Sequence, residues 1–163
     1  MNFKNYTKHR NGTYVSMPLS FASKVELYNF ITNELKLTET VDPSTFHITI
    51  IYSRTPVPTA DKLENFPTIE QASIIGYELF PTKNDGYCLV LRLKYRFAEF
   101  LNKVLTDEGA TSDYNEYKPH VTLAYDTTET LDINTLPIPT FKLSFEPVKV
   151  EPLDEEYNPN VSD

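Results

Sequence analysis

The sequence predicts an α+β domain of two similar lobes, with antiparallel sheets that face a central cleft and helices outside. Segments of strand character alternate with two segments of helical periodicity, so that each half of the chain has a helix followed by a histidine-bearing strand. The two histidine strands, HITIIYS (47–53) and HVTLAYD (120–126), repeat one pattern of residues in register. This recurrence indicates a weak internal duplication.

The first half begins with a strand and a helix. GTYVSMPL (12–19) has β-branched and aromatic residues that follow a glycine and stop at a proline, which predicts a strand. Ser20 or Ser23 can cap the next helix. Its expected buried face consists of apolar residues at helical spacing, namely Phe21, Val25, Tyr28, Ile31 and Leu35. FHITIIYS (46–53) is the next strand, and residues 54–70 are expected to form a loop.

Four more strands are expected in the rest of the chain. ASIIGYELFP (72–81) and GYCLVLRLK (86–94) are joined by the turn-rich TKNDG (82–86). PHVTLAYD (119–126) is the second histidine strand, and FKLSFEPVKVE (141–151) is a last long strand.

The second helix is expected to run from about Arg96 to Glu108, with Gly109 as its C-terminal stop. Its apolar stripe consists of Phe97, Phe100, Leu101 and Val104. With 163 residues, the chain is expected to be a single domain (1–163). Its two lobes are placed roughly at 12–80 and 86–153, followed by an acidic tail at 154–163.

The charge favours a small ligand over a polymer. The formal net charge is −8 and the pI is near 4.9. Affinity for long nucleic acid comes mainly from neutralising phosphates with Lys and Arg, so an acidic chain is not expected to bind long nucleic acid. A small phosphate-bearing ligand in a locally basic pocket is compatible with this charge.

The cysteine content and the hydropathy indicate the compartment. Cys88 is the single cysteine, which excludes an intramolecular disulfide and a cysteine zinc cluster, and its apolar surroundings place it in the core. No run of about 18 apolar residues predicts a membrane span. The N-terminal stretch 1–12 has no apolar signal core. We therefore expect a cytoplasmic protein that does not contact a membrane.

The repeated strands each place a histidine and a threonine on one face. Side chains alternate across a strand, so His47 shares a face with Thr49, and His120 shares a face with Thr122. The aliphatic residues between them belong to the core on the opposite face. If the lobes are related by approximate two-fold symmetry, the two His-Thr pairs meet between them.

Two histidines on either side of a phosphodiester can act as general base and general acid, because one imidazole can be neutral while the other is protonated near neutral pH. Two threonine hydroxyls can donate to the non-bridging oxygens, where negative charge develops. Neither role needs a metal or a cofactor. Two ordinary interpretations compete: surface or core histidines in strands, and a zinc site, although no HExxH motif accompanies the pair. The third histidine, His9, lies in a polar stretch and is expected to be exposed.

The paired tetrapeptides HITI (47–50) and HVTL (120–123) resemble the signature of the 2H phosphoesterase superfamily. Further blocks make the chain similar to one branch, the phage anti-CBASS protein 1 family. These blocks are GTYV (12–15), HITIIYSR (47–54), EGATSDY (108–114), YKPHVTLAYD (117–126), INTLP (133–137) and EPLD (151–154).

This resemblance implies a metal-independent nuclease that cleaves the cyclic di- and trinucleotide messengers of bacterial CBASS immunity in the host cytoplasm. His47 and His120 would be the acid/base pair, and Thr49 and Thr122 would hold the phosphate. The near symmetry of the motifs leaves the assignment of base and acid open, and the sequence does not define the oligomeric state.

The resemblance also implies three substrate-binding residues outside the motifs. Tyr14 would stack on or border a base, Lys118 would supply positive charge or a base contact, and Glu151 would bind a nucleobase edge or orient a histidine. Each has an ordinary alternative, as a strand aromatic, a loop charge and a surface acid.

Two rival functions stay open. One is a 2H enzyme that acts on RNA ends as a 2′,3′-cyclic phosphodiesterase. The other is a module that sequesters a cyclic nucleotide without cleaving it.

Overall fold

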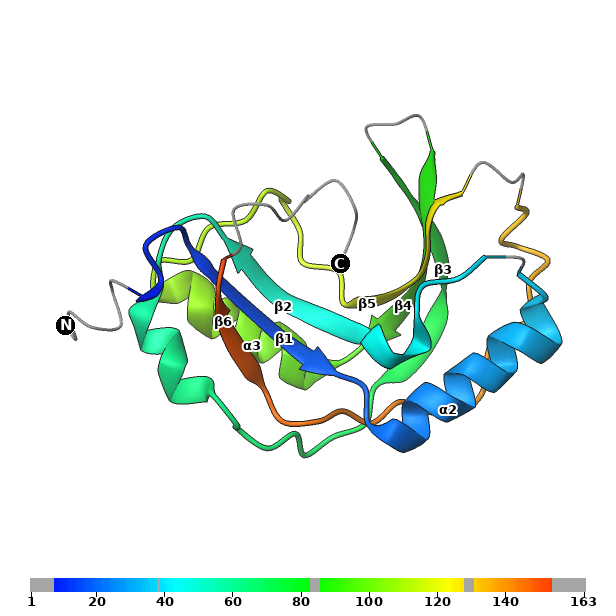
Figure 1. Ribbon diagram of the computed structural model, residues 1–163, viewed down its shortest axis with the longest axis horizontal. Coiled ribbons are helices and arrows are strands. Elements are labelled where there is room, and N and C mark those ends of the chain that lie inside the picture. Colours follow the sequence, from blue (N-terminus) through cyan, green and yellow to red (C-terminus); the bar gives the residue numbers. More distant parts are fainter. Residues whose placement is uncertain (1–7, 38, 83–85, 128–130, 154–163) are drawn as a thin grey trace.

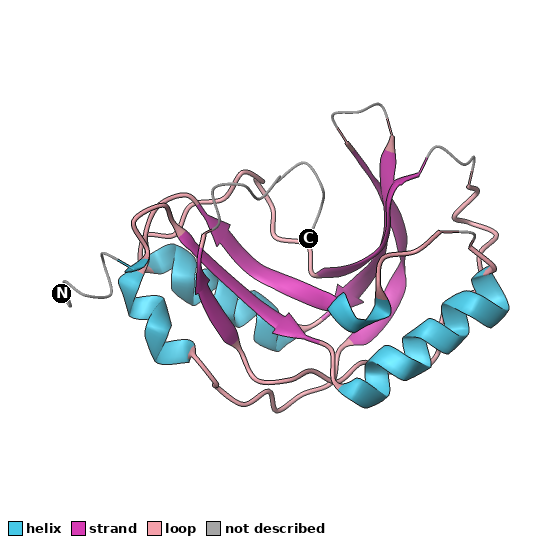
Figure 2. Ribbon diagram, viewed as in Figure 1, coloured by secondary structure: helices cyan, strands magenta, loops and turns pink. Residues whose placement is uncertain are grey.

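The computed structural model describes most of the chain as two three-stranded antiparallel sheets with helices around them (Figure 1). The strand orders are β2-β1-β6 and β3-β4-β5. Figure 2 shows α3 behind the first sheet and α2 at the end of the molecule that carries β3 and β4. The described residues are 8–37, 39–82, 86–127 and 131–153.

The first sheet has β1 (Thr13–Pro18) at its centre, between β2 (His47–Ser53) and β6 (Lys149–Pro152). The two strands predicted at 12–19 and 46–53 are thereby confirmed. Alternate residues of β1 and β2 point into the core, where β-branched and aliphatic side chains are fully buried.

A β-bulge interrupts the pairing of β1 with β2. Val15 and Ser16 are adjacent in β1, but their partners in β2 are separated by one extra residue, Ile50. The carbonyl of Ile50 instead accepts a hydrogen bond from the side-chain amide of Asn102, at 2.8 Å. A bulge re-aims the side chains on one side of the insertion. Its position, directly after Thr49, places it next to the first H-x-T motif.

The second sheet has β4 (Tyr87–Lys94) at its centre, between β3 (Ser73–Pro81) and β5 (His120–Thr127). All three predicted strands are confirmed. The centre of β4 is fully buried, including Cys88, whose predicted place in the core is also confirmed. The predicted turn at 82–86 lies partly outside the described residues, because 83–85 are not described.

The two sheets do not follow the two halves of the chain. β3 comes from the first half but pairs with β4, while β6 returns from the C-terminal end to pair with β1. The predicted acidic tail, 154–163, lies outside the described residues. Because β2 and β5 are edge strands that lie beside each other where the sheets meet, the two histidine strands are neighbours (Figure 1).

Helix α2 (Phe21–Phe30) begins at Ser20, whose hydroxyl accepts from the backbone of Ser23, as predicted. It continues into a π-helical turn over Ile31–Leu35. Ile31 and Leu35 are buried, but the rest of the predicted face is wrong: Phe21 is 78% exposed. Val25 and Tyr28 are exposed as well, and the buried positions are Ser23, Leu27, Ile31 and Leu35. Two apolar stripes fit the helical period, and periodicity alone does not choose between them.

Helix α3 (Arg96–Asp107) ends as predicted at Gly109, which has a φ of 106°. The backbone N–H groups of Gly109 and Ala110 bond the carbonyls of Thr106 and Leu105, at 3.0 and 2.9 Å, in a Schellman motif. Leu101 is buried as predicted, together with Ala98 and Leu105, but Phe100 is 62% exposed. None of the described helices has the length and the hydropathy that crossing a bilayer requires.

The predicted long strand at 141–151 is wrong. Only β6 is a strand there, and Leu143 and Phe145 make isolated bridges to Ala72 and Leu19. Pro147 lacks a backbone N–H and interrupts the ladder. The predicted loop at 54–70 likewise contains a 3₁₀ helix, Pro58–Leu63.

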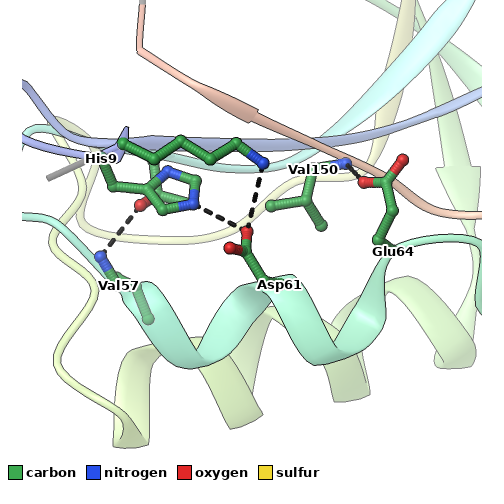
Figure 3. A network of polar contacts seen from close by, with 7 residues as sticks. His9, Val57, Asp61, Glu64 and Val150 are labelled. Atoms are coloured by element: carbon green, nitrogen blue, oxygen red, sulfur yellow. Dashed lines mark hydrogen bonds and ion pairs between the residues drawn. The ribbon is translucent and has the colours of Figure 1, made fainter. Parts of the chain in front are cut away.

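The residues after this 3₁₀ helix cover the outer edge of β6. The backbone of Asn65 donates to the carbonyl of Val148 at 2.8 Å, and Val148 donates to the carbonyl of Phe66 at 2.9 Å. The side chain of Glu64 accepts from the backbone of Val150 (Figure 3). A covered edge offers no template for pairing with another chain.

The prediction that His9 is exposed is wrong. Its side chain is fully buried, and Nε2 lies 2.7 Å from Oδ1 of Asp61 in the 3₁₀ helix (Figure 3). The polar sequence around His9 gave no sign of this tertiary contact. A buried imidazole nitrogen requires a hydrogen-bond partner, and Asp61 provides one for Nε2.

Candidate active site

The first motif lies on the face of the first sheet that also carries Tyr14. The hydroxyl of Tyr14 is 3.0 Å from the hydroxyl of Thr49, across the β1–β2 ladder. On its other side Tyr14 pairs with Glu151 of β6. The charge of Glu151 acts on the imidazole of His47. The structure thus brings together four residues that the sequence analysis had singled out from three separate segments.

The second motif lies in β5, next to β4. His120 lies opposite Arg92 in the ladder, and Thr122 lies opposite Val90. Thr122 is buried, at 5% exposure. Lys118 precedes β5, and its side chain reaches Glu78 of β3, with Nζ 3.3 Å from Oε2. His120 and Thr122 therefore belong to the second sheet, and Lys118 lies just before its strand β5.

Both catalytic candidates are held in the same way. Nδ1 of His47 is 2.7 Å from the carbonyl oxygen of Thr45, and Nδ1 of His120 is 2.8 Å from that of Lys118. In each case the partner is the carbonyl two residues upstream. A carbonyl oxygen only accepts, so each Nδ1 donates and carries a proton. In each neutral imidazole the lone pair is then on Nε2, which is the nitrogen for proton transfer.

Burial sets the charge preference of His47. Burial lowers the pKa of its imidazole below the ordinary value of 6.5, because desolvation disfavours the charged form. The hydrogen bond to Thr45 and the charge of Glu151 oppose this shift, while the charges of Lys149 and Lys24 act in the same direction as burial. The net direction favours a neutral imidazole at neutral pH.

A partly buried tyrosine connects the two motifs. The hydroxyl of Tyr117, shortly before β5, donates to the carbonyl of Thr49 in β2 at 2.7 Å. Burial raises the pKa of Tyr117 far above its usual range, so the hydroxyl keeps its proton and stays a donor. The bond joins the segment that leads to His120 directly to the first motif. Tyr117 lies in the quoted block YKPHVTLAYD, but nothing in its sequence context distinguished it from a core aromatic.

Three further residues near His120 were not singled out by the sequence analysis. The ring of Phe80 contacts the imidazole of His120 edge to face, with centroids 4.9 Å apart. Arg92 and Glu78 form an ion pair at 2.6 Å. The sequence did contain a signal for Arg92, because it is a charged residue inside the apolar strand YCLVLRLK. A charge in a buried strand needs a partner.

Within the described part of the chain, no group of three or more His, Cys, Asp or Glu side chains is placed to hold a metal ion. Thr49 of the first motif bonds Tyr14, and His120 of the second motif contacts the ring of Phe80 and pairs with Arg92 in the ladder.

The family model described as Anti-CBASS protein Acb1 matches residues 11–160. The chain belongs to the Acb1 family. An Anti-CBASS protein Acb1 of Vibrio phage KVP40 is 33% identical over 152 residues, which cover 91% of this chain and 92% of that protein. An Acb1 of Salmonella phage S16 is 31% identical over 125 residues, which cover 77% of each chain. The family resemblance drawn from the motifs is confirmed.

Solved structures show the same fold as this Acb1-family chain. Escherichia coli LigT complexed with NADP+ has a TM-score of 0.53 at 15% identity, and covers 87% of this chain and 94% of its own. LigT complexed with 3′-AMP has a TM-score of 0.52 at 16% identity, with the same coverage. The predicted α+β fold of the 2H phosphoesterase kind is therefore confirmed.

Proposed function

We propose that this Acb1-family protein is a phosphodiesterase that hydrolyses 3′–5′ bonds of cyclic di- and trinucleotides without a metal ion. By destroying the messenger of CBASS immunity in the host cytoplasm, it would act as a phage counter-defence nuclease. The single observation that carries the proposal is the matched pair of histidines, each with Nδ1 bonded to the carbonyl two residues upstream, on the adjacent strands β2 and β5. Membership in the Acb1 family supports the choice of substrate.

The chemistry is a transesterification followed by hydrolysis. Nε2 of the base takes the proton of a ribose 2′-hydroxyl, and the 2′-oxygen attacks the adjacent phosphorus. The bond from phosphorus to the 5′-oxygen breaks, and the protonated histidine gives its proton to that oxygen. The products are a 5′-hydroxyl and a 2′,3′-cyclic phosphate. Water then opens the cyclic phosphate with the two histidine roles exchanged.

The environment of His47 supports its assignment as the base of the first step. Its pKa is lowered by burial, so the neutral form that accepts a proton predominates at neutral pH. His120 is then the acid. Thr49 and Thr122, on the same strands, would donate to the non-bridging oxygens of the phosphate, where negative charge grows in the transition state. The hydroxyl of Tyr14 would orient that of Thr49.

Three residues are assigned to substrate binding. Tyr14 offers an aromatic ring for base stacking, which is worth about 1–3 kcal/mol per base. Glu151, its ladder partner, would accept from a nucleobase edge. Lys118 would contact a phosphate with its ammonium group.

Product analysis with a panel of cyclic di- and trinucleotides tests the proposal. We expect linear or 2′,3′-cyclic products by mass spectrometry in the presence of EDTA, and a loss of about 10²–10⁴-fold in rate for His47→Ala or His120→Ala. Recovery of the intact ligand after heating would instead support the sequestering module. Cleavage restricted to RNA 2′,3′-cyclic ends would support the RNA-end phosphodiesterase. If EDTA abolished the activity and added zinc restored it, the metal-independent mechanism would be overturned.

A further inference from the structure

A cluster of three charged side chains lies on the second sheet beside His120. Nη1 of Arg92 is 2.6 Å from Oε1 of Glu78, and Nζ of Lys118 is 3.3 Å from Oε2 of the same carboxylate. One negative charge is therefore shared by two positive charges. The cluster carries a local excess of positive charge in a chain whose formal net charge is −8.

The cluster and the imidazole share one face of the sheet. Arg92 is the direct ladder partner of His120. The ring of Phe80 lies against His120 at 4.9 Å, and Nζ of Lys118 lies 6.0 Å from the centre of the same ring. The three charged side chains are partly buried, with 21% of Arg92, 34% of Glu78 and 37% of Lys118 exposed. Partial burial strengthens electrostatic interactions and leaves the cluster accessible to a ligand.

The two cations have more hydrogen-bond donors than Glu78 can satisfy. A guanidinium has five N–H donors, and among the described residues Arg92 has only Glu78 as a partner, while its Nε is buried without one. Lys118 has three donors and, within the same residues, one carboxylate oxygen. A phosphate group has the oxygen acceptors and the charge that this arrangement lacks, and a guanidinium can bind it with two parallel bonds.

We infer that Arg92 and Lys118 form a binding site for a second, non-scissile phosphate of the substrate, and that Glu78 occupies this site as an internal competitor until the phosphate binds. The inference rests on the proposed function, because a cyclic di- or trinucleotide necessarily carries a phosphate besides the one that is cleaved. His120 and Thr122 serve the scissile phosphate. The adjacent cluster would therefore distinguish cyclic oligonucleotides from ligands with a single phosphate.

Two substrates separate this role from catalysis. One is a cyclic dinucleotide, which has two phosphates, and the other is a mononucleoside 2′,3′-cyclic phosphate, which has one and undergoes only the second step. For Arg92→Gln we expect KM for the cyclic dinucleotide to rise about 10- to 100-fold, the size expected for a hydrogen bond between charged groups. The ratio of kcat/KM between the two substrates should fall by the same factor. An equal loss for both substrates would overturn the inference and place Arg92 at the scissile phosphate.

Glu78→Gln gives the opposite expectation and so a second, independent check. Removing the competing carboxylate should lower KM for the cyclic dinucleotide about threefold or more and make KM more sensitive to salt, since the freed cations bind the phosphate more strongly. A higher KM in this variant, with an unchanged Tm, would contradict the competitor role. Arg92→Lys should recover part of the loss in Arg92→Gln, because it keeps the charge but not the fork of donors.

The pair Lys103–Asp107 provides the matched control. It is an exposed ion pair on α3, at 3.3 Å. Asp107→Asn and Lys103→Gln alter one charge each, as the test variants do, and should leave the ratio between the substrates unchanged. If the wild-type protein cleaves neither substrate, the proposed function fails. Turnover of both substrates with no effect of Arg92→Gln on either overturns this inference alone.

Discussion

The hydroxyl of Tyr14 lies 3.0 Å from the hydroxyl of Thr49, on the face of the first sheet that carries the first H-x-T motif. Glu151 pairs with Tyr14 on the other side. Tyr14 thus has two separable parts, the aromatic ring that is proposed to stack on a base and the hydroxyl that lies beside Thr49. Substitutions that remove one part or both can measure each contribution.

Tyr14→Phe keeps the ring and removes the hydroxyl. We expect kcat to fall about fivefold, which corresponds to roughly 1 kcal/mol for one hydrogen bond, with little change in KM. Tyr14→Ala also removes the ring, and KM should rise by about 5- to 150-fold, from the loss of stacking of about 1–3 kcal/mol. Steady-state kinetics on the preferred cyclic dinucleotide measures both. Equal effects of the two variants on KM would show that the ring does not contact a base.

The roles of the two histidines can be separated with a substrate that needs no general acid. In a cyclic dinucleotide with sulfur in place of the 5′-bridging oxygen, the leaving thiolate departs without a proton. We expect His120→Ala to cleave this substrate at a rate near that of the wild type, while His47→Ala stays slow by about 10²–10⁴-fold. Thiol release, followed with a chromogenic disulfide, measures the rate. Rescue of His47→Ala instead would reverse the assignment.

Tyr117→Phe removes the hydroxyl that joins the two motifs. The carbonyl of Thr49 then loses this donor in a partly buried environment, which should lower the free energy of unfolding by about 1–3 kcal/mol. Urea denaturation of both proteins measures the difference. Tyr28→Phe, at an exposed position of α2, is the matched control and should change stability by less than about 0.5 kcal/mol. Equal stability of the two variants would mean that water replaces the lost hydroxyl without cost.

The lowered pKa of His47 predicts how stability changes with pH. In the unfolded chain the imidazole takes up a proton near its ordinary pKa of 6.5, whereas in the folded chain it does so only at a lower pH. Below pH 6.5 the unfolded state therefore binds more protons, and the free energy of unfolding decreases as the pH falls through the folded pKa. Above the unfolded pKa of 6.5 the contribution of His47 is complete and independent of pH.

Urea denaturation at pH 7.5 and pH 5.5 compares the wild type with His47→Gln, which cannot titrate. The variant should lose less stability between the two pH values than the wild type. A larger loss in the variant would show that His47 has a raised pKa in the folded protein.

Much of the fold could be predicted from local pattern. β1 and β2 show the β-branched alternation that a half-buried strand requires. The H-x-T repeat, read from the sequence alone, predicted that His47 and His120 lie on two strands, which are β2 and β5. Ser20 and Gly109 were found because capping needs particular side chains or a positive φ.

The errors have a common physical origin in tertiary contacts. Phe21 and Leu27 both fit the period of α2, and only the neighbouring layer decides which one is buried. The segment around Leu143 has strand propensity, but it makes only isolated bridges, from Leu143 to Ala72 and from Phe145 to Leu19. Strand pairing sets Arg92 opposite His120, and Glu78 of β3 bonds Arg92 in turn, two relations that no local motif encodes.

The return of β6 to the first sheet has a consequence for biosynthesis. The second sheet is built from one continuous stretch, 73–127, so it can form while the ribosome is still translating. The first sheet is complete only when Glu151 of β6 pairs with Tyr14 of β1, and β6 is synthesised after every strand of the second sheet. The strands around the second motif can therefore pair before β6 has been made, whereas the ladder that sets Glu151 beside Tyr14 forms only after β6 has left the ribosome.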